Sequence, residues 1–284
     1  LEELDRLCST FIELGVKKLR ITGGEPLVRK NIMELFSKLG SKLGKGLDEL
    51  TLTTNGSQLD KYAKDLLKSG VQRVNVSLDS LDINKFKKIT KFGDFNKVIK
   101  GIMAAKDIGL KIKINTVALK GINDNEILNL VKWCGENKFA LTFIEVMPMG
   151  EIGEKRADQY MPLTDVKYLI QTKYSLSKDP LKTSGPATYM HCQETDQKIG
   201  FITPHTHNFC ELCNRVRVTC SGEMYMCLGQ QDKADLKTPL RKSENNQILK
   251  DTIYEAISRK PKGHDFLIDR EKDFVPRHMN VTGG

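Results

Sequence analysis

Hydrophobic positions in the first half of the chain follow two alternating periodicities, one typical of helices and one typical of strands. Segments with the period of an amphipathic helix are each followed by a short run rich in β-branched residues. There are five such runs, at residues 17–23, 48–56, 71–79, 111–119 and 140–148. Gly15, Gly70 and Gly109 follow helical patterns, where a left-handed helix end is expected. The pattern predicts repeated βα units and a parallel sheet with outer helices, as an open doubly wound sheet or a full or partial barrel.

The carboxyl ends of these predicted strands carry polar residues, glycines and prolines. Their sequences are TGGEP, TTNG, SLDS, NTV and EVMP. Ligand sites of parallel sheets gather at these ends. Gly23 and Gly24 would let a ligand approach the backbone, and Thr53 and Ser77 could bind hydroxyl or amino groups, although such residues also form turns and helix caps. Because the carboxyl ends of all five predicted strands are polar, we predict that they form one ligand site.

The alternation fades after about residue 150. A loop and a helix-like segment at 164–174 are followed by four strand-like pieces, at 188–193, 198–204, 215–220 and 223–229. This region is predicted to be a smaller antiparallel unit, with a helix near 247–259 and an irregular tail. We therefore divide the chain into a βα part, 1–150, and a C-terminal part, 151–284.

Three cysteines in the C-terminal part have the spacing of metal ligands: Cys210, Cys213 and Cys227. Two thiolates two residues apart can bind one metal or cluster, and the third would come from the next hairpin. A structural zinc ion needs a fourth ligand, for which three residues are near: Cys220, His205 and His207. Without it, three thiolates suit an iron–sulfur cluster with one open iron. The other thiols stand singly and are expected to be core or surface residues: Cys8, Cys134 and Cys192.

Charge and composition narrow the class of partner. The 284 residues carry a formal net charge of +9, which favours nucleic acid or a small phosphorylated substrate. Four cations stand on elements whose ends could converge as an anion clamp: Arg20, Lys113, Arg215 and Arg217. There is no apolar run near 18 residues and no export signal, and the odd number of cysteines argues against a disulfide framework. We expect a cytoplasmic protein with reduced thiols and no contact with a membrane.

The motifs resemble one family in order, the GTP 3′,8-cyclases, which are radical S-adenosylmethionine (SAM) enzymes of molybdenum cofactor biosynthesis. The matching stretches are RITGGEPLVR, LTTNG, NVSLDSLD, KINTV, FIEVMP, FCELCNRVRVT and the terminal Gly-Gly. GGEP is shared by many radical enzymes, whereas Cys-x2-Cys-Asn-Arg-x-Arg with a third cysteine thirteen residues on is far more restrictive. The resemblance implies a partial TIM barrel of the radical SAM type. A smaller C-terminal α+β region would cover its open side and carry a second [4Fe-4S] cluster.

The resemblance also implies roles for individual residues. Those expected to face GTP are Arg20, Thr53, Lys113, Arg215, Val216 and Arg217. Those expected to contact SAM are Gly24, Ser77 and Met147. The ligands of the C-terminal [4Fe-4S] cluster would be Cys210, Cys213 and Cys227, with the fourth iron open to guanine. The implied partners are a reducing electron donor and a downstream cyclic pyranopterin monophosphate synthase, without nucleic acid, and a homodimer is compatible with the family.

The sequence departs from the family pattern at the first cluster. The family binds that cluster with Cys-x3-Cys-x2-Cys, and no such spacing exists in these 284 residues. The chain opens with Leu1 inside a helical pattern, so we expect upstream sequence that carries this motif. Taken alone, these residues are expected to be inactive, and an arginine that contacts GTP in the family would lie in the same upstream segment.

Two further positions bear on the site. Thr142 stands where many members have arginine before Phe-Ile-Glu, a loss that Lys155 or Arg156 could compensate. In the family the double glycine tail, here Gly283 and Gly284, reaches into the active site.

Two other functions stay open. A zinc-ribbon nucleic-acid-binding protein would explain the charge and the cysteine hairpin. The aromatic content of 7% and the lack of a basic stripe argue against it. Another radical SAM enzyme with an auxiliary cluster would share the motifs and act on a different substrate.

Overall fold

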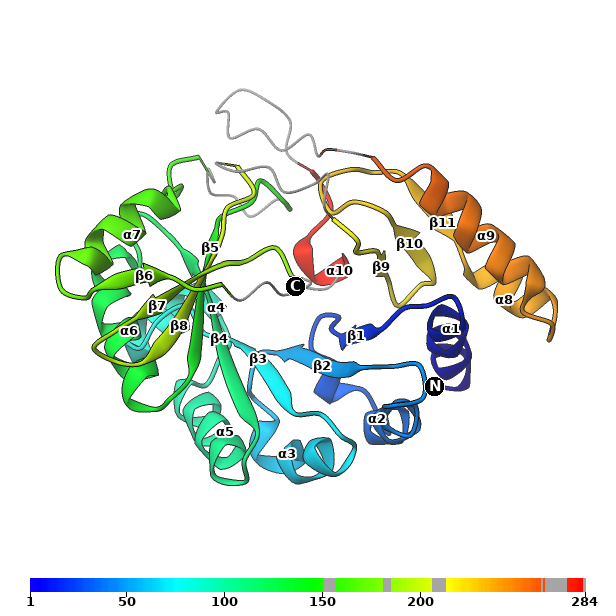
Figure 1. Ribbon diagram of the computed structural model, residues 1–284, viewed down its shortest axis with the longest axis horizontal. Coiled ribbons are helices and arrows are strands. Elements are labelled where there is room, and N and C mark those ends of the chain that lie inside the picture. Colours follow the sequence, from blue (N-terminus) through cyan, green and yellow to red (C-terminus); the bar gives the residue numbers. More distant parts are fainter. Residues whose placement is uncertain (151–156, 181–184, 206–212, 262, 264–274, 283–284) are drawn as a thin grey trace.

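The structure is a computed structural model that describes the chain except for residues 151–156, 181–184, 206–212, 262, 264–274 and 283–284. Its centre is an eight-stranded sheet with the order β1-β2-β3-β4-β5-β8-β7-β6 (Figure 1). The strands, in that order, are β1 (Lys18–Ile21), β2 (Glu49–Thr54), β3 (Arg73–Ser77), β4 (Lys111–Ala118), β5 (Ala140–Glu145), β8 (Gln197–Ile202), β7 (Thr188–Cys192) and β6 (Leu176–Lys178). The first six run parallel, β7 pairs antiparallel with β8, and β6 pairs antiparallel with β7.

Each of the five strands predicted before residue 150 forms, because each is followed or preceded by a helix that covers its apolar face. Gly15, Gly70 and Gly109 have the positive φ values expected at helix ends, 94°, 83° and 91°. The helices of the described chain are α1 (Glu2–Glu13), α2 (Ile32–Gly40), α3 (Leu59–Lys68), α4 (Ile83–Thr90), α5 (Phe95–Asp107), α6 (Ile127–Glu136), α7 (Leu163–Gln171), α8 (Lys237–Lys242), α9 (Gln247–Ser258) and α10 (Met279–Thr282). Two short 3-10 turns are η1 (Pro26–Val28) and η2 (Asp124–Glu126).

The two faces of the sheet differ in chemistry because successive side chains of a strand point to opposite sides. On one face Leu52, Val76, Ile114 and Phe143 are fully buried in the main apolar core. Figure 1 shows α2, α3, α5, α6 and α7 along this side of the sheet. The opposite face is polar and is turned towards β9 (Arg217–Val218), β10 (Glu223–Tyr225) and α10 (Figure 1). The site is therefore expected between this polar face and the C-terminal elements.

Two segments after residue 150 are placed differently from the prediction. The pieces at 188–193 and 198–204 were predicted to belong to a separate antiparallel unit, yet they form β7 and β8 of the main sheet. β8 pairs parallel to β5, and its Ile199 and Phe201 extend the apolar face beyond Leu141 and Phe143. A local hydrophobic pattern gives the strand but not its partner, which explains the error. The described separate sheet consists of β9, β10 and β11 (Lys233–Asp235).

The first helix belongs to the packing of the C-terminal elements. Leu7 and Phe11 of α1 are buried in a second apolar cluster together with Met224, Met226 and Ile253. Arg6 strengthens this contact, because its guanidinium donates to the carbonyl of Leu240 at 2.9 Å and to Asn246 Oδ1 at 2.8 Å. The first helix therefore shares one core with the elements from β10 to α9.

Candidate active site

Residues predicted for GTP lie on the polar face of the sheet. The register pairs Thr53 with Asn75 and Asn75 with Lys113, so these three side chains stand side by side on one face. Arg20 stands in register with Thr51, which is paired in turn with Arg73. Thr53 Oγ1 is buried and has no hydrogen-bond partner among the described residues. A buried hydroxyl of this kind is ready to bind a polar ligand.

Arg20 stands among other cations. Loss of solvation lowers the pKa of Arg20, and the charges of Arg73 and Arg215 lower it further. Its side chain is nevertheless in contact with solvent. Arg20 is therefore surrounded by other cations and is also reachable from solvent.

Arg217, which belongs to the cysteine hairpin, lies close to the cations of the sheet. Burial lowers the pKa of its guanidinium to about 10, and repulsion from Arg215, Arg20 and Arg277 acts in the same direction. Loss of solvation also lowers the pKa of Lys113, with Arg73 and Arg20 adding to the shift. The six cations therefore repel one another in the absence of an anion: Arg20, Arg73, Lys113, Arg215, Arg217 and Arg277. A polyphosphate at their centre would relieve this repulsion.

Sequence reasoning missed two members of this cation cluster. Arg73 donates to Glu49 Oε1 at 2.6 Å, but its Nε is buried without a partner among the described residues. Arg277 lies 4.0 Å from the centre of the Tyr225 ring and donates to the carbonyl of Leu228 at 2.7 Å. The alternation of β3 could have revealed Arg73, which points to the same face as Asn75. Arg277 had no sequence signal, since it lies in a segment without regular pattern.

The cysteine hairpin has features of a thiolate site. Cys213 and Cys227 lie in the described chain, and Cys210 lies outside the described residues. β9 and β10 pair antiparallel, with Arg217 opposite Tyr225, which brings the segments before β9 and after β10 to the same end. Lys260 Nζ ties these segments together by donating to the carbonyl of Arg215 at 2.9 Å and to that of Met226.

The charge environment of Cys213 favours a thiolate. Burial alone would raise the pKa of its thiol, but hydrogen bonding from Arg215 and the charges of Arg215 and Lys260 outweigh burial and lower the pKa. Thiolates are the ligands of iron–sulfur clusters. The two described cysteines therefore fit such a cluster, with Cys210 as the third ligand predicted from sequence.

Of the three candidates for a fourth zinc ligand, Cys220 and His205 lie in the described chain. His205 Nε2 lies 3.0 Å from the carbonyl oxygen of Val146, and Cys220 is exposed. Within the parts of the chain that the structure describes, no three His, Cys, Asp or Glu residues are grouped so that they could hold a metal ion. His207 lies outside those parts. The zinc alternative thus gains no support from Cys220 or His205.

The turn predicted to bind SAM follows β1. Gly23 has a φ of 122°, and a Cβ added at Gly24 would meet no atom within 4 Å, so a ligand has room beside this backbone. Glu25 fixes the turn against the end of β2. Its carboxylate accepts from Thr54 Oγ1 at 2.7 Å and from the backbone N–H of Asn55 at 2.7 Å. Sequence reasoning had not identified this function of Glu25.

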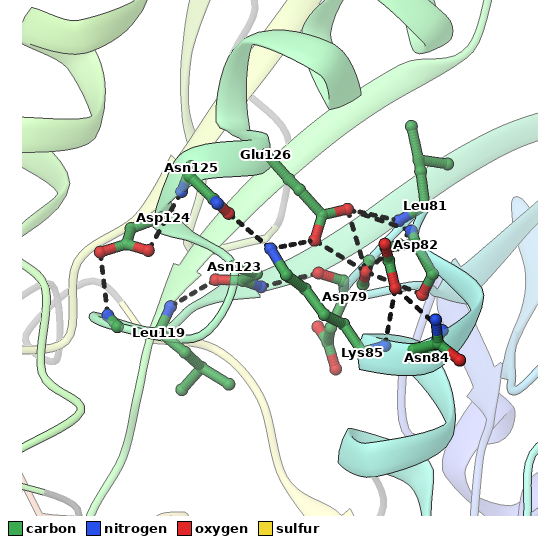
Figure 2. Close-up of polar contacts among 12 residues, drawn as sticks. Asp79, Leu81, Asp82, Asn84, Lys85, Leu119, Asn123, Asp124, Asn125 and Glu126 are labelled. Carbon is green, nitrogen blue, oxygen red and sulfur yellow. Dashed lines mark hydrogen bonds and ion pairs between the residues drawn. The ribbon is translucent and has the colours of Figure 1, made fainter.

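The other two predicted SAM contacts also lie at strand ends. Ser77 is the last residue of β3 and is exposed, and Met147 follows β5 and is half-buried. The loop after Ser77 is held by the network in Figure 2. Buried Glu126 accepts from Ser80 Oγ and the backbone N–H of Leu81, both at 2.9 Å, and pairs with Lys85 at 3.0 Å. This carboxylate fixes the chain just beyond the candidate SAM contact.

A second part of the same network involves Asn123. Its amide donates to the carbonyl oxygens of Asp79 at 2.7 Å and Val117 at 2.9 Å, and its Oδ1 accepts from the N–H of Leu119 (Figure 2). Asn123 thereby joins the ends of β3 and β4. Five strand ends were predicted to form one site, and these bonds hold two of them together.

The last described residues lie beside the cation cluster. Arg217 Nη1 donates to the carbonyl oxygen of Thr282 at 3.3 Å, and Thr282 is buried. Figure 1 shows α10 between the sheet and β9. Gly283 and Gly284, predicted to reach the site, lie outside the described residues, as do Lys155 and Arg156.

The single thiols are placed as predicted. Cys134 and Cys192 are buried, and burial raises the pKa of Cys8 to about 12. Buried thiols, and a thiol whose pKa is raised, are poor metal ligands and nucleophiles. A search of the described helices for one that is long and apolar enough to cross a membrane finds none.

Comparison with known families divides the chain in two. Residues 1–134 match the Radical SAM superfamily, and residues 139–266 match the family described as Molybdenum Cofactor Synthesis C. Proteins named GTP 3′,8-cyclase are similar along the entire chain. The protein from Rhizobium etli (strain CIAT 652) is 58% identical over 286 residues, covering 100% of this chain and 82% of its own length. The protein from Mesorhizobium japonicum is 58% identical over 287 residues, covering 100% of this chain and 87% of its own length.

Solved structures with the same fold are more distant in sequence. Streptococcus suis SuiB, bound to the precursor peptide SuiA, is 18% identical with a TM-score of 0.62 over 87% of this chain and 58% of its own. The protein anSMEcpe, with bound AdoMet and a Cp18Cys peptide, is 16% identical with a TM-score of 0.56 over 99% of this chain and 79% of its own. At these identities the likeness establishes the fold.

Proposed function

Because this chain belongs to the GTP 3′,8-cyclase family of radical SAM enzymes, we propose that it takes part in the cyclisation of GTP to 3′,8-cyclo-7,8-dihydroguanosine 5′-triphosphate. This reaction is the first step of molybdenum cofactor biosynthesis. The observation that carries the proposal is the cation cluster between the polar face of the sheet and the cysteine hairpin. Lys113 and Arg277 are buried and Arg73, Arg215 and Arg217 are half-buried, an arrangement that suits a small triphosphate better than a nucleic-acid duplex.

The substrate residues follow from this arrangement. Arg215 and Arg217 would hold the triphosphate from the hairpin, with Val216 between them, and Arg20 and Lys113 would hold it from the sheet. Thr53, with its buried hydroxyl, would bind a sugar or base group. Arg73 and Arg277 would add charge at the edge of the site. By fixing GTP from two sides, these residues would orient the ribose and exclude water.

The cofactors of the family are SAM and a [4Fe-4S] cluster. When bound, they supply the 5′-deoxyadenosyl radical that removes hydrogen from the ribose C3′ of GTP, after which C3′ joins guanine C8. Gly24, Ser77 and Met147 would position SAM at the strand ends. These 284 residues contain no Cys-x3-Cys-x2-Cys motif, so the ligands of the SAM cluster are not among them.

A second [4Fe-4S] cluster is assigned to the C-terminal region. Its ligands would be Cys210, Cys213 and Cys227, and the open iron would receive guanine. The lowered pKa of Cys213 and the pinning of both ligand segments by Lys260 support this assignment. For the finer fold, the proposal is a partial TIM barrel in 1–150 with the C-terminal α+β region in 151–284, where β6, β7 and β8 of the C-terminal region extend the barrel sheet.

The proposed partners complete the reaction. A reductant must supply the electron that cleaves SAM, and the product would pass to a cyclic pyranopterin monophosphate synthase. A homodimer is compatible with this role.

Anaerobic reconstitution of the 284-residue chain tests the proposal first. About four irons with matching sulfide, together with GTP binding measured by calorimetry, are the expected result. One zinc without sulfide would overturn the cluster assignment and would favour the zinc-ribbon alternative. Conversion of GTP is then measured after fusing the Cys-x3-Cys-x2-Cys segment of a relative ahead of Leu1. If the fused protein cleaves SAM but leaves GTP unchanged, another radical SAM reaction is the better interpretation.

A further inference from the structure

Tyr189 stands beside the candidate phosphate site without a place in the function described so far. It lies on β7, one of the strands that the sequence pattern had assigned to a separate unit, and is 5% exposed. Its hydroxyl accepts a hydrogen bond from Lys113 Nζ at 2.9 Å, and the same ammonium lies 5.2 Å from the centre of its ring. The phenol also lies within electrostatic reach of Arg20. Tyr189 therefore contacts the cation cluster from β7, the strand next to the sheet edge formed by β6.

The local sequence creates the space for this ring. Tyr189 is in register with Gly200, and Gly200 with Thr142. A Cβ at position 200 would lie 2.7 Å from Thr142 Oγ1 and 3.1 Å from Cε1 of Tyr189, closer than side chains normally approach. The absence of a side chain at Gly200 therefore leaves the ring of Tyr189 its room beside Thr142.

We propose that Tyr189 is a positioning residue for phosphate binding, which holds the Lys113 ammonium against the triphosphate site. The inference rests on the proposed GTP-binding function. An ammonium has three N–H donors. One is given to Tyr189, and the other two can reach phosphate oxygens. Fixing a flexible lysine before the ligand arrives reduces the entropy lost on binding.

The alternative is that Tyr189 only fills space above Gly200. Both interpretations predict a loss when the ring is removed, but they differ when the hydroxyl alone is removed. Tyr189→Phe keeps the ring and deletes the acceptor for Lys113. A packing role would leave the preference for the triphosphate unchanged, whereas a positioning role would weaken it.

The experiment is calorimetric binding of GTP and of guanosine to the anaerobically reconstituted 284-residue chain. Tyr189→Phe is expected to bind GTP about tenfold more weakly and guanosine with unchanged affinity. Lys113→Met should show the same pattern, and Tyr189→Phe should have little further effect in the Lys113→Met background. Tyr174→Phe is the matched control, because Tyr174 is a buried tyrosine in the outer core. Iron content and melting temperature are measured for every variant.

Three outcomes would overturn the inference: unchanged GTP affinity in Tyr189→Phe, equal losses for GTP and guanosine, or additive losses in the double variant. These results leave the proposed function intact as long as the unaltered chain binds GTP. If the unaltered chain with a full cluster binds no GTP, the proposed function fails and the inference falls with it.

Discussion

Arg217 is the residue in which the two halves of the site meet. It is the first residue of β9, it is repelled by the positive charges of Arg20 and Arg277, and it donates a hydrogen bond to the carbonyl oxygen of Thr282. We expect Arg217→Ala to weaken GTP binding about 10- to 100-fold, the range for losing a charge-assisted hydrogen bond, while iron content stays the same. Calorimetry and iron analysis of the reconstituted chain measure both. Arg241→Ala, which removes an exposed arginine paired with Glu3, is the control. Equal GTP affinity in Arg217→Ala would remove this residue from the clamp.

Lys113 gives the site a pH dependence. Loss of solvation lowers its pKa below the ordinary 10.5, so the folded protein releases this proton at a lower pH than an exposed lysine does. Its contribution to binding phosphate is therefore complete at neutral pH and is lost as the pH rises towards 10.5. The measurement is the ratio of GTP dissociation constants of Lys113→Met and the unaltered chain across this range, which cancels the titration of guanine. The ratio should shrink with rising pH, and a constant ratio would contradict the assignment.

A substitution at Cys227 tests which residues are the ligands of the cluster. Replacement by serine removes one of three proposed thiolate ligands, so iron and sulfide should fall to near zero after reconstitution. Cys220→Ser is the matched control, since Cys220 is exposed and stands in the same hairpin region. Full iron content in Cys227→Ser, or loss of iron in Cys220→Ser, would change the ligand set.

At the scale of elements, the Glu126 network provides a test of how the SAM edge is held. Glu126 is buried and accepts hydrogen bonds from Ser80 and from the backbone N–H of Leu81, so Glu126→Ala takes the acceptor away from two polar groups, whereas the half-buried Lys85 keeps its bond to Asn125. We expect a loss of about 2–4 kcal/mol in the free energy of unfolding, the range for leaving two buried groups unpaired, measured by urea denaturation. Glu136→Ala removes an exposed glutamate paired with Lys132 and should cost less than about 0.5 kcal/mol. Similar losses for both variants would show that the network is dispensable.

Elements were predicted well where the signal is local. The five strands before residue 150 were found because each has a neighbouring helix and its own apolar residues, and three of them follow a glycine at a helix end: Gly15, Gly70 and Gly109. The register that places Thr53, Asn75 and Lys113 in one row could not be predicted from a local pattern, and neither could the pairing of β8 with β5. Arg73 could have been found from strand alternation, but Tyr189 could not, because its neighbour Lys113 lies 76 residues away in sequence. The division of the chain at about residue 150 stays a prediction.

At the scale of the whole molecule, the site depends on parts that are distant in sequence. β1, β4 and the cysteine hairpin each supply cations, and α1 packs on the hairpin through Leu7 and Phe11. The family motifs identified most of these residues by type and order. Their convergence is a property of the fold, which no single motif contains.

Because α1 shares this core with the cysteine hairpin, we predict that a substitution in α1 affects how well the hairpin retains its iron–sulfur cluster. Phe11 is 5% exposed and packs in the same apolar cluster as Met224 and Met226, the latter next to Cys227. Phe11→Ala should lower the free energy of unfolding by about 3–5 kcal/mol because it leaves a cavity, and iron should be lost faster to a chelator. Urea denaturation and the rate of iron release measure the two effects, with Phe92→Ala as control because Phe92 is 96% exposed. If Phe11→Ala unfolds more easily but releases iron at the original rate, the helix stabilises the fold without supporting the cluster, and the coupling proposed between them is wrong.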